Sequence, residues 1–179
     1  MDSAWQRKDR KIHTRDIQIA TYSCDGGYVI VEGILTDEHL VPVHSARKGK
    51  TPPDVIHHMI LRFLIQIPSL VIKDVEAELL RLPHEECLDT ISSLDRIKGM
   101  KVAPGFTAQV KKVLGGTRGC AHLTALLLAM APAVVQGSWI HITRKPPEKE
   151  FSSGLVEKFL VDTCHVWRKD GPLAKRVLK

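Results

Sequence analysis

The sequence is poor in aromatic residues and has no closely spaced pair of cysteines. Phenylalanine, tryptophan and tyrosine make up 5% of the 179 residues, and they are not interleaved with the basic runs. The chain therefore offers no stacking platform for single-stranded nucleic acid and no specific nucleic-acid motif. The four cysteines, Cys24, Cys87, Cys120 and Cys164, form no Cys-x-x-Cys pair. This spacing excludes a zinc ribbon and a thioredoxin-like motif.

Long apolar runs are also missing. The longest, residues 123–135, is shorter than the roughly 20 residues that cross a bilayer, and Pro132 lies within it. The first residues are charged and lack the apolar segment of a signal peptide. We therefore expect a cytoplasmic protein without a membrane segment, in which the cysteines are free thiols or metal ligands.

The composition is that of a folded protein, with 44% apolar and 26% charged residues. At this length we expect one core: a basic extension over residues 1–15, a single α+β domain over 16–140, and a C-terminal helix and basic tail over 151–179 packing on the same domain. Much of the net charge of +6 sits at the two ends. Such charge favours solvated termini, or contact with an acidic partner.

Apolar residues alternate with polar ones in the first half of the chain, which predicts strands. Residues 16–23 and 28–35 form a hairpin across a glycine turn, residues 57–67 give the clearest period-2 pattern, and residues 71–79 form a fourth strand. Between the second and third strands, residues 41–54 are rich in proline and basic residues and predict a mobile loop.

Helical periodicity begins only after these strands. We expect helices from residue 83 to 99, from 106 to 114, from 120 to about 136, and from 152 or 153 to 164, with a linker over 146–150. This order predicts an α+β fold: an antiparallel sheet of three to four strands followed by four helices packed on one face.

The residues best suited to a functional site lie at 115–123, Gly-Gly-Thr-Arg-Gly-Cys-Ala-His-Leu. This glycine-rich segment leads directly into the most apolar predicted helix. Cys120 and His122 are predicted in the first turn of that helix, where its positive end favours a thiolate. A thiolate there suits a metal ligand or a nucleophile. Two residues this close on a helix point about 200° apart, so we expect the base for a nucleophilic Cys120 to be His57, His58 or His84.

Four candidate metal ligands lie at the starts of predicted elements. They are His57 on the third strand, Cys87 on the first helix, and Cys120 and His122 on the apolar helix. Cysteine sulfur and histidine nitrogen are the donors that zinc prefers in proteins. Cys164 and His165 are further reactive residues without an assigned role.

Several sequence segments resemble those of a bacterial family of uncharacterised proteins, the domain-of-unknown-function family 2889. The similarity covers roughly residues 12–136 and is carried by residues 12–15, 28–37, 56–59, 94–99 and especially 115–123. His58 and Ala121 depart from the family's typical His-Asp-Met and Gly-Cys-Thr-His-Leu. Membership of this family implies no activity.

A more distant resemblance is to iron–sulfur cluster scaffold proteins of the NifU and IscU type, and it implies a NifU/SufE-like layout. In those proteins three cysteines and an auxiliary aspartate or histidine hold a cluster or zinc. The resemblance places His57, Cys87 and Cys120 where the three cysteines stand, with His122 as a local alternative donor. An imidazole in place of one thiolate favours zinc over an iron–sulfur cluster.

Three functions follow from these patterns. The first is a metal-binding protein, with zinc or less readily an iron–sulfur cluster held by His57, Cys87, Cys120 and His122. The second is a thiol-dependent enzyme with Cys120 as its nucleophile. The third is a non-catalytic binding module that meets an acidic partner through the basic ends of the chain.

Overall fold

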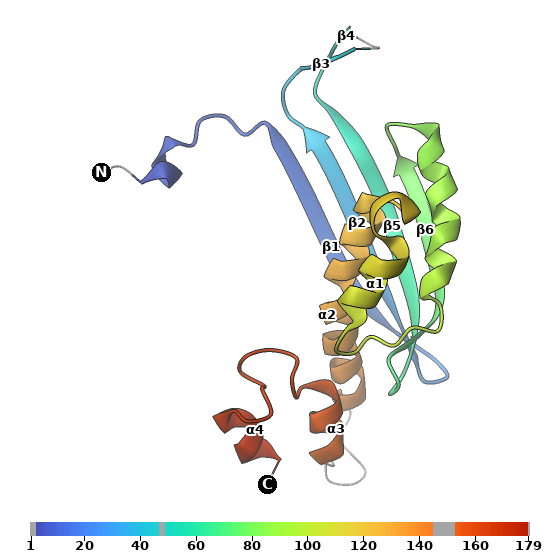
Figure 1. Cartoon of the computed structure of the whole chain (residues 1–179), viewed down its shortest axis with the longest axis vertical. Helices are drawn as coiled ribbons and strands as arrows, with labels where there is room; N and C mark the ends of the chain where they lie inside the picture. Colours follow the sequence, from blue (N-terminus) through green and yellow to red (C-terminus); the bar gives the residue numbers. More distant parts are fainter. Residues whose placement is uncertain (1–2, 47–48, 145–152, 179) are drawn as a thin grey trace.

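A four-stranded antiparallel sheet forms the body of the protein. The computed structural model describes residues 3–46, 49–144 and 153–178. In spatial order β1-β2-β5-β6, the strands are β1 (His13–Cys24), β2 (Tyr28–His39), β5 (Asp54–Gln66) and β6 (Val71–Arg81). Figure 1 shows the strands running side by side, with the main helices over one face. The α+β class and the antiparallel sheet are as the sequence predicts.

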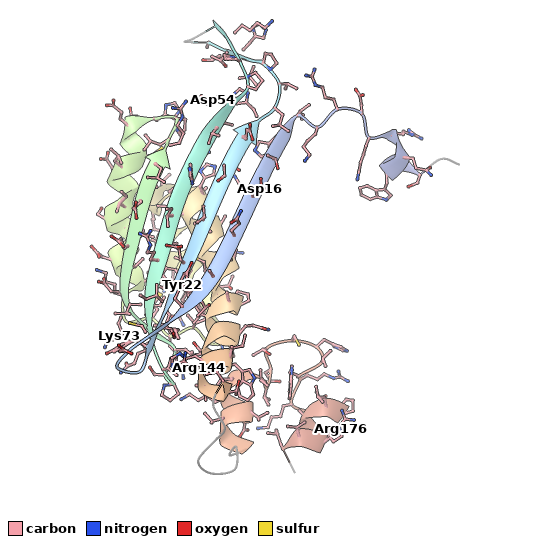
Figure 2. All side chains as sticks on the ribbon, turned by 180° about the vertical axis from the view of Figure 1, so that it is seen from behind. Asp16, Tyr22, Asp54, Lys73, Arg144 and Arg176 are labelled. Atoms are coloured by element: carbon pink, nitrogen blue, oxygen red, sulfur yellow. The ribbon has the colours of Figure 1, made fainter. Side chains whose placement is uncertain are left out.

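Alternation of buried and exposed residues fixes which face of the sheet is covered. Successive side chains on a strand point to opposite faces. In β5 the residues Met59, Leu61, Phe63 and Ile65 are buried, each separated from the next by a partly exposed neighbour. β2 shows the same pattern and pairs with β5 along its length. The covered face therefore holds the core, and the opposite face has no helix over it in the part of the chain that the structure describes (Figure 2).

The predicted hairpin between β1 and β2 is present. Its turn places Gly26 and Gly27 at φ values of 74° and 82°, which glycine adopts without the strain that a side chain introduces. The predicted loop over residues 41–54 is wrong in one respect, because it contains a small second sheet. Within it, β3 (Val43–Ser45) pairs with β4 (Gly49–Thr51).

The helical layer begins with a 3₁₀ helix, η2 (Glu85–Ile97), where the sequence predicts an α-helix. Leu94 and Ile97 are buried, and a spacing of three residues places them on one face of a 3₁₀ helix. α1 (Phe106–Leu114) is as predicted, with its first and last residues buried. Two short 3₁₀ helices remain: η1 (Ala4–Arg7) precedes β1, and η3 (Gly116–Arg118) lies between α1 and α2.

The central helix α2 (Ala121–Thr143) is longer than predicted, because it continues beyond residue 136 to Thr143. It crosses β1 and β2 at close range: a Cβ placed on Gly137 lies 2.3 Å from Oγ1 of Thr21 on β1. The helix residues Leu126, Leu127 and Met130 are fully buried. The helix therefore supplies the largest part of the core from the helical side.

By length and composition alone, α2 is able to cross a membrane. It has 23 residues, its most apolar window has a mean hydropathy of 1.6, and 33% of that window is buried. The expectation of a protein without a membrane segment is not tested by this composition and stays a prediction. The same composition also serves the core, because Leu123, Leu126, Met130 and Val134 pack under the sheet.

The C-terminal segment contains two short helices instead of one. α3 (Ser153–Phe159) ends earlier than predicted, and α4 (Pro172–Val177) follows. Phe159 is 1% exposed, with its ring 6.1 Å from that of Trp139 on α2. Figure 1 shows α3 and α4 beside the end of α2, beyond the sheet, so the prediction of four helices on one face is corrected to η2, α1 and α2. The predicted linker over residues 146–150 lies outside the described residues.

Candidate metal centre

Three potential metal ligands converge where the covered face of the sheet meets the start of α2. They are Asp37 near the end of β2, His57 near the start of β5, and His122 in the first turn of α2. Asp37 and His57 are direct partners in the antiparallel register, so their side chains share a face. The ligand atoms of all three residues lie within 4.8 Å of one another. Three separate elements thus bring an O,N,N donor set to one point.

The distances are close to those of a coordination sphere. Oδ2 of Asp37 lies 3.2 Å from Nδ1 of His57 and 3.6 Å from Nε2 of His122. Two ligands about 2.1 Å from a tetrahedral zinc ion lie roughly 3.4 Å from each other. The two imidazole rings are partly stacked, with centroids 3.7 Å apart and planes tilted by 30°. The three donors are close enough together to hold one metal ion.

The site is largely shielded from water. The side chains of Asp37, His57 and His122 are 2%, 12% and 30% exposed. Nδ1 of His57 is buried and makes no hydrogen bond, because its contact with Asp37 lacks the required alignment. Buried polar atoms are nearly always satisfied. A cation at this point gives the nitrogen the partner that it lacks.

Arg15 on β1 holds Asp37 in a bidentate ion pair. Its Nε and Nη2 donate to Oδ1 and Oδ2 of Asp37, each at 2.6 Å. These bonds are the main reason that the pKa of Asp37 is lowered from its ordinary value, although burial opposes the shift. His13, also on β1, lies 3.7 Å from the same carboxylate. Asp37 is therefore ionised and fixed in orientation, with Oδ2 close to both histidines.

Both imidazoles are biased toward the neutral form, which is the form that binds metals. Burial lowers the pKa of His57, and the negative charge of Asp37 only partly offsets this. Burial also lowers the pKa of His122, and the neighbouring His57 adds to the effect. Ligand nitrogens compete with protons for a metal ion. The site consequently meets little proton competition near neutral pH.

Cys120 lies directly beside His122, although not where helical geometry predicts. It is the residue before α2, with φ −86° and ψ 130°, so the separation of about 200° expected for two helical residues does not apply. Its Sγ lies 3.8 Å from Nδ1 of His122. That nitrogen is on the opposite side of the ring from Nε2, which faces Asp37. Cys120 therefore contacts the nitrogen of His122 that does not face Asp37.

Cys87 is outside this group of donors. It lines a shallow pocket of about 450 Å³ together with Cys120, His84, Glu86 and Thr90. The pocket thus borders the site through Cys120, which is common to both. His84 also lines a larger neighbouring groove of about 1120 Å³ near the start of η2. Of the ligands predicted from sequence, the structure brings His57 and His122 together, places Cys120 next to them, and leaves Cys87 in the wall of the pocket.

The other reactive residues named from the sequence take no part in the donor group. His58 follows His57 on β5, so its side chain points to the opposite face of the sheet. Cys164 and His165 lie between α3 and α4, and His165 contacts the guanidinium of Arg168.

Sequence reasoning missed Asp37 and Arg15. A signal was present, because the buried face of β2 carries Val31, Gly33 and Leu35 at alternate positions and Asp37 continues that series. An acidic residue at an inward position of a strand needs a partner. The inward face of β1 at the same level supplies one, since Arg15 is the register partner of Asp37.

The fold and the site define an α+β protein with two histidines and one carboxylate at the junction of its sheet and central helix. Residues 13–136 match the family described as "Protein of unknown function (DUF2889)". The match covers more than half of the chain and includes all the site residues, so the protein belongs to this family. No curated protein and no solved structure matches the chain.

Proposed function

We propose that this protein binds one metal ion through Asp37, His57 and His122. The observation that supports the proposal best is the buried Nδ1 of His57, which makes no hydrogen bond and lies 3.2 Å from a carboxylate that Arg15 holds in place. The three ligands come from two strands and a helix that share one core, which makes the donor set rigid.

Zinc is the occupant that these donors suit best. Two imidazoles and a carboxylate form a known catalytic zinc set, which leaves a position open for water or substrate. The same set also serves ferrous iron, which is therefore the second occupant to test. An iron–sulfur cluster requires thiolate ligands, and the donor group contains none. The likeness to NifU and IscU scaffolds and the NifU/SufE-like layout stay predictions, and this donor set gives them no support.

The neighbouring residues have positioning roles in this proposal. Arg15 orients the carboxylate of Asp37 and keeps it ionised. With a metal on Nε2, Nδ1 of His122 carries the proton and points it at Cys120. A bound zinc ion supplies Lewis acidity and lowers the pKa of a bound water. The protein's own contribution is a fixed donor set and partial exclusion of solvent.

Metal content and affinity test this proposal. The protein is purified without added metal, stripped with a chelator, and titrated with zinc or ferrous iron against a competing dye. We expect about one metal per chain for the wild type, and at least a tenfold loss of affinity in Asp37→Asn and His122→Gln. His44→Gln, at an exposed position of β3, is the matched control and retains binding. Unchanged binding in Asp37→Asn, or no binding by the wild type, rejects the proposal.

A second candidate is a thiol-dependent enzyme, because Cys120, His122 and Asp37 also form a relay. The thiol lies 3.8 Å from one nitrogen of His122, and the carboxylate lies 3.6 Å from the other. In this arrangement His122 takes the thiol proton and Asp37 stabilises the resulting imidazolium. His122 itself is then the base that the sequence analysis assigned to more distant histidines.

Alkylation rates test the thiol candidate. In metal-free protein we expect iodoacetamide to modify Cys120 faster than the exposed Cys164, and the rate at Cys120 to fall in His122→Gln. Peptide mapping after brief exposure measures both sites in one sample. Equal rates at the two cysteines, or a rate at Cys120 that does not depend on His122, exclude this candidate.

The binding-module function, a cytoplasmic location and the absence of a membrane segment stay proposals. The basic residues Arg7, Lys8, Arg10 and Lys11 are exposed, which supports contact with an acidic partner.

A further inference from the structure

The carboxylate of the metal centre is already neutralised by the protein. Asp37 is 2% exposed, and both of its oxygens accept hydrogen bonds from the guanidinium of Arg15 at 2.6 Å. In an ordinary site with two histidines and one carboxylate, the carboxylate cancels one of the two charges of a divalent metal. Here the positive charge of Arg15 cancels the carboxylate first. The protein ligands and their nearest cation then sum to zero.

Within the described residues, Asp37 is the carboxylate that contacts the two histidines, and no second carboxylate is paired with either of them. The other groups that act on them are Arg15, His84 for His57, and the thiol of Cys120, which lies 3.8 Å from the outer nitrogen of His122. An imidazole that binds a metal ion is in its neutral form, so the two histidines add no charge to the centre. A divalent ion at this point therefore keeps a net charge of about +2, in surroundings where water screens it poorly.

The start of α2 increases this positive potential. His122 is its second residue, and no side chain caps the helix there. The first amides of a helix lack intrahelical acceptors and carry a partial positive charge. The helix start does not define a site by itself. It adds to the excess of positive charge that already follows from the pairing of Asp37 with Arg15.

We infer that the metal centre takes an oxyanion, a carboxylate or phosphate group of its ligand or substrate, as an additional ligand of the metal. This inference rests on the proposed function, because the oxyanion occupies a coordination position that the three protein ligands leave open. The oxyanion supplies the negative charge that Asp37 no longer provides to the metal, because Arg15 neutralises Asp37. The exposed edge of His122 and the pocket that adjoins it through Cys120 leave room for the remainder of such a molecule.

The inference predicts that metal and oxyanion bind cooperatively. Cobalt(II) is the probe, because its visible spectrum reports both affinity and coordination. The metal-free protein is titrated with cobalt(II) in a perchlorate medium alone, with acetate, and with inorganic phosphate. We expect one of these anions to raise the cobalt(II) affinity by about tenfold or more, within the usual range of coupling between two ligands. Acetate and phosphate tell which oxyanion the centre prefers.

Arg15 is the residue that creates this requirement, so its variants provide the control. Arg15→Gln keeps a hydrogen-bond donor but removes the charge, and we expect the anion effect to fall below about twofold. Arg15→Lys restores the charge and should restore the effect. Arg62→Gln removes a carboxylate-paired arginine from the other face of the sheet and should leave the effect intact.

The outcomes separate this inference from the proposed function. Cobalt(II) binding that neither anion strengthens overturns the inference and leaves the metal site in place. The same result follows if Arg15→Gln shows the full anion effect while circular dichroism confirms that it is folded. Failure to bind cobalt(II) in every medium overturns the metal site, and the inference with it.

Discussion

Replacing Arg15 with leucine removes the only fixed positive charge that contacts the buried Asp37 in the described structure. Both oxygens of Asp37 lose a 2.6 Å charge-assisted hydrogen bond. Removing one partner of a fully buried ion pair costs about 3–5 kcal/mol, because the other charge stays buried. Arg15 is 39% exposed, so water enters part of the space that it leaves. We therefore expect a loss of about 2–3 kcal/mol in the free energy of unfolding.

Urea unfolding, followed by circular dichroism in EDTA, measures this loss. Arg62→Leu is the matched control, since Arg62 pairs with Glu32, Glu76 and Glu78, which are 22%, 68% and 42% exposed. Water replaces Arg62 more easily, so we expect a cost of about 1 kcal/mol or less. Saturating zinc should stabilise Arg15→Leu more than the wild type, because the ion restores a charge beside Asp37. Equal costs of Arg15→Leu and Arg62→Leu in EDTA refute the reasoning.

Three further predictions follow from the packing and the site. Gly137→Ala should lower the free energy of unfolding by about 1–2 kcal/mol in urea, because the new Cβ meets Oγ1 of Thr21 at 2.3 Å. This cost exceeds the gain from the better helix propensity of alanine. A variant as stable as the wild type, or more stable, contradicts this contact. Stability should fall as the pH drops below about 6.5, because unfolding releases His57 and His122 from surroundings that lower their pKa, so the unfolded chain binds more protons. His122→Gln should flatten that dependence between pH 7.5 and 5.5, and an unchanged slope counts against the pKa assignment. Cys120→Ala should keep one zinc per chain but weaken its affinity by about tenfold, because it removes the group beside Nδ1 of His122, whereas complete loss of zinc indicates a direct ligand.

The sheet was predictable because its strands are long and alternate strictly. Met59, Leu61, Phe63 and Ile65 alternate with more exposed residues over most of β5, and only a strand of the expected length explains that pattern. The helix type of η2 was not predictable, since Leu94 and Ile97 share a face in an α-helix and in a 3₁₀ helix alike. The extension of α2 beyond residue 136 was not predictable from the local sequence, because it includes contacts made in the folded protein, such as the burial of Ser138.

Two of the three donors were predictable from residue type and position. His57 and His122 both stand at the starts of predicted elements, whereas Asp37 stands near the end of a strand and was passed over. Its role becomes visible only through the register that pairs Asp37 with His57 on one side and with Arg15 on the other. A sequence read one element at a time contains no such register. The contact between Cys120 and His122 was missed for a different reason, because Cys120 is not yet helical.

Anomalous diffraction from a crystal of the zinc-loaded protein, recorded on both sides of the zinc absorption edge, tests the central claim most directly. We predict a single strong zinc peak per chain about 2.1 Å from a carboxylate oxygen of Asp37 and from one nitrogen each of His57 and His122. A peak at Cys87 and Cys120 instead, or no peak near the two histidines at full zinc loading, contradicts the account.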